Sequence, residues 1–172
     1  MNGDSFFLDL RVETQSVANW CWAEAASAIT RYLDGSTLTA CRLASMVHDC
    51  DCCETPDSRK CAREFHVRDA MEQYTCNLRD EIHDRGGRML PGDLVRQELA
   101  AGYPIWLRLT WRLAPRNALR HTVIVRGIEG DVVNVADPYF GYTLIDLEDL
   151  NDDYGMARGK IDAVYLTKRA SE

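Results

Sequence analysis

A glutamine lies six residues before a cysteine at the start of an apolar helical pattern, in the segment QSVANWCWA at residues 15–23. A helix leaves its first backbone N–H groups unpaired and is electropositive at that end, so a cysteine there is favoured as a thiolate nucleophile. The Gln15 side chain and the Cys21 backbone N–H would then both donate hydrogen bonds to the oxygen of an attacked carbonyl. The spacing predicts a nucleophilic Cys21 with an oxyanion hole that includes Gln15.

A candidate base and a candidate acid follow in two segments with strand-like patterns. His121 opens the run HTVIVRGI, and Asp137 ends the run DVVNVAD, which a short turn joins to the first. In an antiparallel hairpin the start of the first strand lies beside the end of the second, so we expect the two residues to be neighbours. We therefore predict that His121 takes the proton of Cys21 and that Asp137 orients the imidazole ring. This chemistry requires no metal and no cofactor.

These motifs resemble the papain-like cysteine proteases, and more closely their compact bacterial branches, including those related to bacteriocin-processing peptidases. The resemblance rests on the Gln-x5-Cys-Trp-Ala block, on Gly102-Tyr103-Pro104 before a strand, on the His121 strand and on DPYFG at residues 137–141, in that order. It implies a cysteine protease that cleaves peptide bonds through an acyl-enzyme intermediate. Asp137 stands where papain has asparagine, but several bacterial branches use aspartate there.

The periodicity of the chain predicts helices first and strands later. Helical patterns cover residues 21–33, 37–47, 67–74 and 91–101, and strand patterns cover residues 105–111, 122–128, 132–136, 142–145 and 163–167. The glycine-containing segment 84–88 is predicted to be a flexible connector. We therefore expect one α+β domain over residues 1–172, with a helical half to about residue 102 packed on a twisted antiparallel sheet from about residue 103. The resemblance implies that this domain is papain-like.

Charge and hydropathy exclude some partners. The net charge of −7 disfavours binding to the phosphate backbone of nucleic acids. The sequence has no run of about 20 apolar residues to span a membrane, and its first ten residues lack a secretory signal. We expect neither a nucleic acid nor a membrane as a partner. A peptide or protein substrate is expected, together with a delivery machine, an immunity protein or a larger parent polypeptide.

The cysteine content leaves several interpretations open. Seven cysteines are many for 172 residues, and without Cys21 six remain, at positions 41, 50, 52, 53, 61 and 76. Six cysteines permit up to three disulfides in 15 pairings, which the sequence cannot resolve. Reduced structural cysteines and a zinc site are the alternatives, although only one Cys-x2-Cys pair is present. Disulfides would imply an exported or secreted effector, whereas reduced cysteines would fit a cytoplasmic protein.

Other residues have competing interpretations. Trp20 and Trp22 would either contact substrate or pack in the core beside the helix start. His48, His66 and His83 lie among charged residues and are expected to be solvated. The acidic residues between positions 146 and 153 are predicted to form a solvated surface, with recognition of basic peptides as the alternative.

The chemistry of the site also has alternatives. Transglutaminase-like enzymes, arylamine acetyltransferases and peptidoglycan endopeptidases use a thiol, an imidazole and an acid in the same chain order. The Gln-x5-Cys-Trp-Ala block favours peptide-bond hydrolysis among these. A different class, a non-catalytic and cysteine-stapled binding domain, would keep the cleft but not the reactivity of Cys21.

Overall fold

The computed structural model describes residues 5–83, 90–114, 117–155 and 159–172, and its centre is a seven-stranded antiparallel sheet. Six strands lie in the order β2-β7-β3-β4-β5-β6, and β1 pairs with β4 outside this path. The strands are β1 (Ser5–Phe7), β2 (Leu78–His83), β3 (Ile105–Ala114), β4 (Asn117–Glu129), β5 (Val132–Asp137), β6 (Gly141–Asp146) and β7 (Lys160–Thr167).

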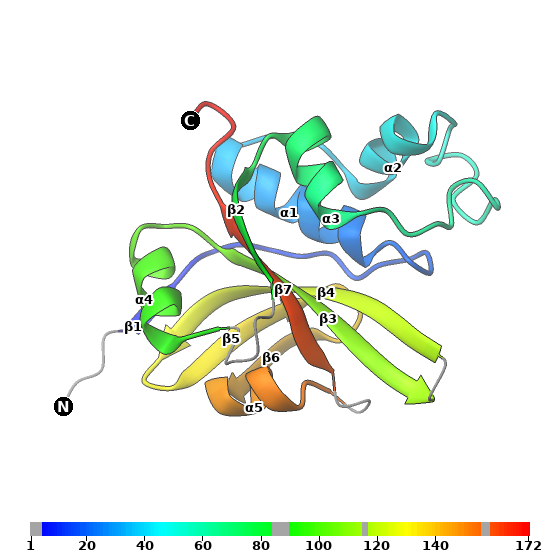
Figure 1. The fold of residues 1–172 in the computed structure, drawn as a ribbon. Helices are drawn as coiled ribbons and strands as arrows, with labels where there is room; N and C mark the ends of the chain where they lie inside the picture. The colour runs from blue at the N-terminus through cyan, green and yellow to red at the C-terminus, as the bar shows by residue number, and fades with distance from the viewer. Residues whose placement is uncertain (1–4, 84–89, 115–116, 156–158) are drawn as a thin grey trace.

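The helices pack against both faces of this sheet. They are α1 (Cys21–Asp34), α2 (Ala40–His48), α3 (Val67–Asp69), which continues into the π-helix η1 (Ala70–Thr75), α4 (Gly92–Ala100) and α5 (Leu147–Asp152). In Figure 1, α1, α2 and α3 form a layer on one side of the sheet and α5 lies on the other. The predicted α+β class is confirmed. None of the described helices has the length and apolar character needed to cross a membrane.

Helix α1 is the central helix that the periodicity predicted. Eleven of its residues are buried, and it ends where Gly35 takes a left-handed conformation with φ of 64°. Glycine favours that conformation because it has no Cβ, which explains why the helix stops there. Helix α2 begins at Ala40, three residues later than predicted, because the Thr39 side chain accepts a hydrogen bond from the Arg42 N–H and acts as the N-cap.

Strands β1 and β2 and helix α5 were not predicted. β1 has three residues, and β2 has the sequence LRDEIH, whose partly exposed positions show no clear alternation of apolar and polar residues. Both strands precede residue 102, so the sheet also includes parts of the predicted helical half. The acidic run forms α5, in which Leu150 is buried. The predicted connector at residues 84–88 lies outside the described residues.

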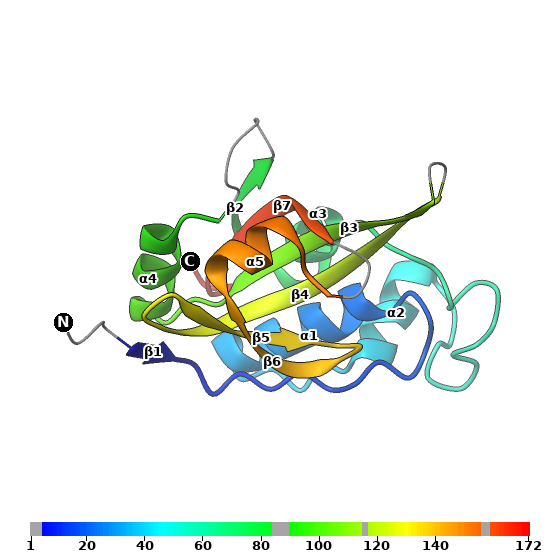
Figure 2. The same ribbon diagram turned by 90° about the horizontal axis from the view of Figure 1, so that it is seen from below.

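An extended segment from Leu8 to Gln15 follows the sheet before the chain enters α1 (Figure 2). The Leu8 N–H donates to the Arg126 carbonyl at 2.8 Å, and the Arg126 guanidinium donates back to the Leu10 carbonyl at 2.9 Å. Farther along, the Gln15 N–H donates to the Pro138 carbonyl at 2.7 Å. This segment is therefore held to the sheet along its length.

Two disulfides hold the cysteine-rich loop between α2 and α3: Cys41–Cys53 ties the loop to α2, and Cys52–Cys61 lies within the loop. Cys50 is half-buried and free, and Cys76 is exposed and free. Of the three disulfides expected at most, two are formed within the described residues. Because each bond joins residues only 9 or 12 positions apart, the pair constrains this loop rather than the whole fold.

Candidate active site

The β4–β5 hairpin brings His121 and Asp137 together as predicted. Ile124 is opposite Ala136 in the hairpin, so Asp137 continues β5 toward His121. The ring Nε2 of His121 lies 2.8 Å from Oδ1 of Asp137. His121 is 4% exposed and Asp137 is 1% exposed, so this hydrogen bond is shielded from water. With Nε2 bonded in this way, Nδ1 is the ring nitrogen left for another partner.

Asp137 accepts hydrogen bonds at both carboxylate oxygens. The backbone N–H groups of Tyr139 and Phe140 donate to Oδ1 at 2.7 and 3.1 Å, and the Tyr154 hydroxyl donates to Oδ2 at 2.9 Å. Burial raises the pKa of Asp137, but the hydrogen bond and charge of His121, with these other donors, lower it by more. The carboxylate therefore stays ionised. No sequence motif marked Tyr154, because it comes from an irregular segment after α5.

The surroundings of His121 favour its protonated form. Burial lowers the pKa of His121, but hydrogen bonds and charge interactions with Asp137 and Cys21 raise it to about 9. Trp111 stacks on the imidazole with ring centroids 4.7 Å apart and an interplanar angle of 21°. Gly159 also lies against Trp111, where even a Cβ would collide with the indole ring. The position of Trp111, the last residue of a predicted strand, gave no signal of this contact.

Cys21 is the first residue of α1, lines the same cavity as His121, and is one of the groups that raise the pKa of His121. The N-cap residue, Trp20, makes no side-chain hydrogen bond to the helix. Asn19 has φ of 67°, a left-handed conformation that asparagine tolerates better than most residues, and this turn leads the chain into the helix. The structure therefore brings Cys21, His121 and Asp137 together in the predicted order.

Gln15 also lies at this site. It lines the same cavity as Cys21 and His121. Its side-chain Nε2 donates to the Val17 carbonyl at 3.2 Å, which leaves a second N–H on that nitrogen, and its Oε1 is buried without a hydrogen-bond partner among the described residues. The amide is thus less fixed by hydrogen bonds than the Asp137 carboxylate.

Two cavities meet at Cys21. The first, of about 300 Å³, is bounded by Trp22, Phe65 and Val67 from the helical side and by Arg108 and Thr122 from the sheet. The second, of about 530 Å³, is bounded chiefly by Trp111, Leu119, Tyr139 and Phe140, with Gln15 beside them. Cys21, Glu64 and Arg120 line both. A chain bound at Cys21 would therefore have both cavities next to it.

The two tryptophans beside Cys21 differ in position. Trp20 is 2% exposed and donates from its indole N–H to the Cys61 carbonyl at 2.7 Å, so it has almost no surface to offer a substrate. Trp22 is equally buried, but it lines the smaller cavity and donates to the Arg63 carbonyl at 3.2 Å. The expectation that His48 is solvated is wrong, because its ring packs edge-on against Trp22 with centroids 5.9 Å apart.

Comparisons with known proteins indicate the class of protein. A family model described as papain-like cysteine protease AvrRpt2 matches residues 5–79, which include Gln15 and Cys21. A crystal structure of a C39-like peptidase from Bacillus anthracis has a TM-score of 0.61 at 14% identity, covering 96% of this chain and 98% of that one. The Pseudomonas avirulence protein AvrPphB has a TM-score of 0.40 at 17% identity, covering 92% and 96%. No curated protein matches the sequence.

The family match over residues 5–79 and the fold shared with the C39-like peptidase make this chain similar to papain-like cysteine proteases. The fold is α+β and papain-like, with the helix that carries Cys21 on one side and the sheet that carries His121 on the other. His121 and Asp137 lie beyond the residues that the family model matches, so their pairing is known from the structure alone.

Proposed function

We propose that this protein hydrolyses peptide bonds with a triad of Cys21, His121 and Asp137, and that Gln15 contributes to the oxyanion hole. The observation that carries the proposal is the His121–Asp137 hydrogen bond of 2.8 Å, which leaves the other ring nitrogen for Cys21. The raised pKa of His121, about 9, further favours an imidazolium beside a thiolate at neutral pH.

The proposed reaction has two steps. The Cys21 thiolate attacks the carbonyl carbon of the scissile bond, and the oxyanion receives hydrogen bonds from the Cys21 backbone N–H and the free N–H of Gln15. His121 then gives its proton to the leaving amine, so that the C–N bond breaks and a thioester remains on Cys21. In the second step His121 takes a proton from water, the resulting hydroxide attacks the thioester, and the acid product leaves as the thiolate re-forms.

Thiol labelling tests the nucleophile without knowledge of the substrate. At pH 6 we expect iodoacetamide to label Cys21 much faster than Cys76, the exposed free cysteine, because only Cys21 contacts an imidazolium. His121→Ala should reduce the Cys21 rate to that of Cys76, as measured by peptide mapping. Equal Cys21 rates in both proteins would contradict the triad.

The labelling experiment also separates the proposal from a non-catalytic binding domain, which would show no enhanced labelling rate at Cys21.

The substrate and the type of reaction need a second assay. An epoxide inhibitor of papain-like enzymes should modify Cys21, and mass spectrometry of a digested peptide library should show products cut at one internal amide bond. Products with exchanged amines or transferred acyl groups, or cleavage confined to cell-wall peptides, would favour the other thiol enzymes considered above.

We further propose that the protease acts after export, as an effector or toxin, or as a maturation peptidase. The support is the pair of disulfides that hold the loop between α2 and α3, since such bonds persist mainly in oxidising compartments. Non-reducing peptide mapping of the protein isolated from its producing cells and from their surroundings would test this role. Fully reduced cysteines in both fractions would contradict it.

A further inference from the structure

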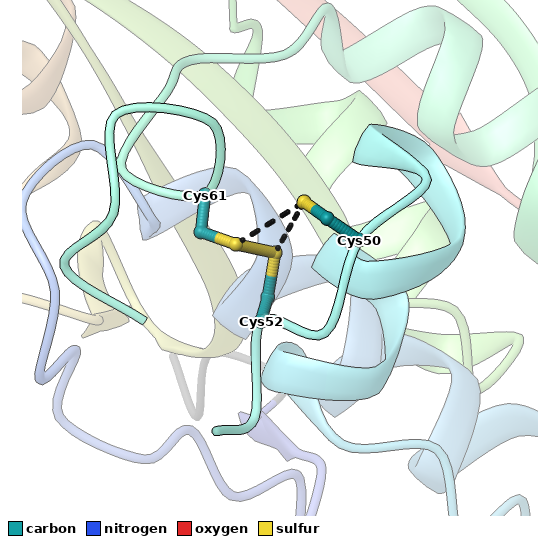
Figure 3. Close-up of side chains that lie close together, drawn as sticks. All are labelled: Cys50, Cys52 and Cys61. Atoms are coloured by element: carbon teal, nitrogen blue, oxygen red, sulfur yellow. Dashed lines mark hydrogen bonds between the residues drawn. A yellow bond between two sulfur atoms is a disulfide. The ribbon is translucent and has the colours of Figure 1, made fainter. Parts of the chain in front are cut away.

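Three sulfur atoms lie together beside α2, although a disulfide requires only two. Cys52 and Cys61 form a disulfide, and the Sγ of Cys50 lies 3.6 Å from the Sγ of Cys52 and 3.4 Å from that of Cys61 (Figure 3). The three sulfurs all lie within 4.8 Å of one another. Cys52 and Cys61 are fully buried, whereas Cys50 is half-buried. Cys50 is therefore the most exposed residue of the three.

The backbone around the cluster fixes this arrangement. Asp49 ends α2 in a left-handed conformation with φ of 50°, which turns the chain so that Cys50 faces the disulfide. Ser45 accepts a hydrogen bond from the Cys52 N–H at 2.9 Å and donates to the Cys41 carbonyl at 2.8 Å. The Cys50 side chain thus belongs to an ordered site rather than to a free loop.

The position of Cys50 relative to the disulfide does not suit thiol–disulfide exchange. Exchange proceeds by attack of a thiolate on one sulfur along the extension of the S–S bond. The two nearly equal distances instead place the Cys50 sulfur beside the S–S bond. They are close to the separation of about 3.8 Å between sulfurs that bind one tetrahedral Zn²⁺ at about 2.3 Å.

We propose that Cys50, Cys52 and Cys61 form a redox-gated site for a thiophilic cation, with Zn²⁺ as the expected ion. A dithiol reductant converts the Cys52–Cys61 disulfide into two thiols and is itself oxidised to a disulfide. The three thiols then lose three protons to solvent and bind Zn²⁺ as thiolates, with water in the fourth position. The site holds a disulfide when oxidised and a metal ion when reduced.

This site is mechanically connected to the cleft. The carbonyls of Cys61, Ala62 and Arg63 accept hydrogen bonds from the side chains of Trp20, Asn19 and Trp22, which surround Cys21 in sequence. Glu64 and the residues after it line the cavities at Cys21. A metal ion in the reduced protein would hold the same loop that the disulfide holds in the oxidised one. The cleft would then keep its shape in either redox environment.

Cobalt binding tests the proposal, because Co²⁺ replaces Zn²⁺ and thiolate ligands give a charge-transfer absorption whose strength follows their number. We expect the reduced protein, titrated with Co²⁺ without oxygen, to show one equivalent of three-thiolate absorption that Zn²⁺ displaces. Cys50→Ser removes one ligand but leaves both disulfides able to form, so its oxidised fold can be checked by circular dichroism. It should weaken metal binding on the order of 100-fold, since structural zinc derives its large binding free energy from only a few ligands.

Matched variants locate the metal. Cys76→Ser, which removes the exposed cysteine, and Cys21→Ser, which removes the nucleophile, should leave the absorption unchanged. Limited proteolysis should cut the loop at residues 53–60 in the reduced metal-free protein and spare it in the zinc-loaded one. Absence of the thiolate absorption, its persistence in Cys50→Ser, or its loss in Cys21→Ser would each overturn the proposal.

Discussion

The sheet side and the helix side of the site differ in how firmly they hold their groups. On the sheet side, Asp137 receives four hydrogen bonds from His121, Tyr139, Phe140 and Tyr154. On the helix side, α1 has no side-chain N-cap bond and Gln15 has one buried oxygen without a partner among the described residues. In the proposed mechanism the base is thus fixed before substrate binds, whereas the helix side keeps N–H donors free for the oxyanion.

The largest expected effect is the loss of activity when the nucleophile on the helix side or the base on the sheet side is removed. Cys21→Ala and His121→Ala should each lower kcat/KM by about 10⁴-fold or more, because the thiolate and its proton donor act as a unit. The double variant should be no worse than either single variant. An additive loss, measured on a cleaved peptide found by the library screen, would show that the two sides act separately.

Removal of the Asp137 carboxylate should destabilise the sheet side of the site. Asp137→Ala leaves the buried donors of His121 and Tyr154 without an acceptor, so the free energy of unfolding should fall by about 3–5 kcal/mol in urea denaturation. Asp137→Asn is the matched control, because an amide oxygen can still accept from His121. It should retain most of the stability. An equal loss of unfolding free energy in both variants would show that the charge of Asp137, rather than its hydrogen bonds, stabilises this part of the site.

A smaller effect is expected on the helix side. Gln15→Ala should lower turnover by about 10²-fold, the usual loss for one oxyanion donor. The free energy of unfolding should change by no more than about 1 kcal/mol, since the side chain makes one hydrogen bond, to Val17. Unchanged turnover would remove Gln15 from the site and leave the Cys21 N–H as the proposed donor.

The smallest effect is a shift in pH dependence. The pKa of His121 is raised from 6.5 to about 9, so kcat/KM should fall as the pH rises through about 9. The same sign applies to stability: the contribution of protonated His121 is fully present below pH 6.5 and is lost as the pH rises through about 9. Asp137→Asn removes a negative charge from the ring, so its alkaline limb should lie at lower pH. If the alkaline limb of the pH profile did not move, it would reflect the titration of a group other than His121.

The parts of the site that the sequence predicted are those fixed by local pattern. The runs of β-branched residues and the turn at Gly130 predicted the β4–β5 hairpin, and a hairpin alone brings His121 to Asp137. The helical period that begins at Cys21 likewise predicted α1. These relations depend on neighbours in the chain, which a single sequence displays.

The remaining features depend on contacts between distant segments. Tyr154 reaches Asp137 from a segment without a recognisable pattern, and Trp111 lies on His121 only because β3 and β4 pair in one register. The pairing of the cysteines was also undecided, since all 15 arrangements were compatible with the sequence. Strand β2 lacks an alternating pattern because its positions are only partly buried at the sheet edge.

The extended segment from Leu8 to Gln15 makes the molecule sensitive to a single backbone cut. Its hydrogen bonds to Arg126 and Pro138 anchor the residue that would stabilise the oxyanion. A protease that nicked this stretch would leave Cys21, His121 and Asp137 in their own elements, but Gln15 would lose the support of the hydrogen bonds at Leu8 and Leu10 and keep only its own bond to Pro138. After such cleavage Cys21 would still react with a thiol-reactive inhibitor, but the proposed turnover of substrate would fall. Because the cut peptide bond does not re-form, this loss would be irreversible.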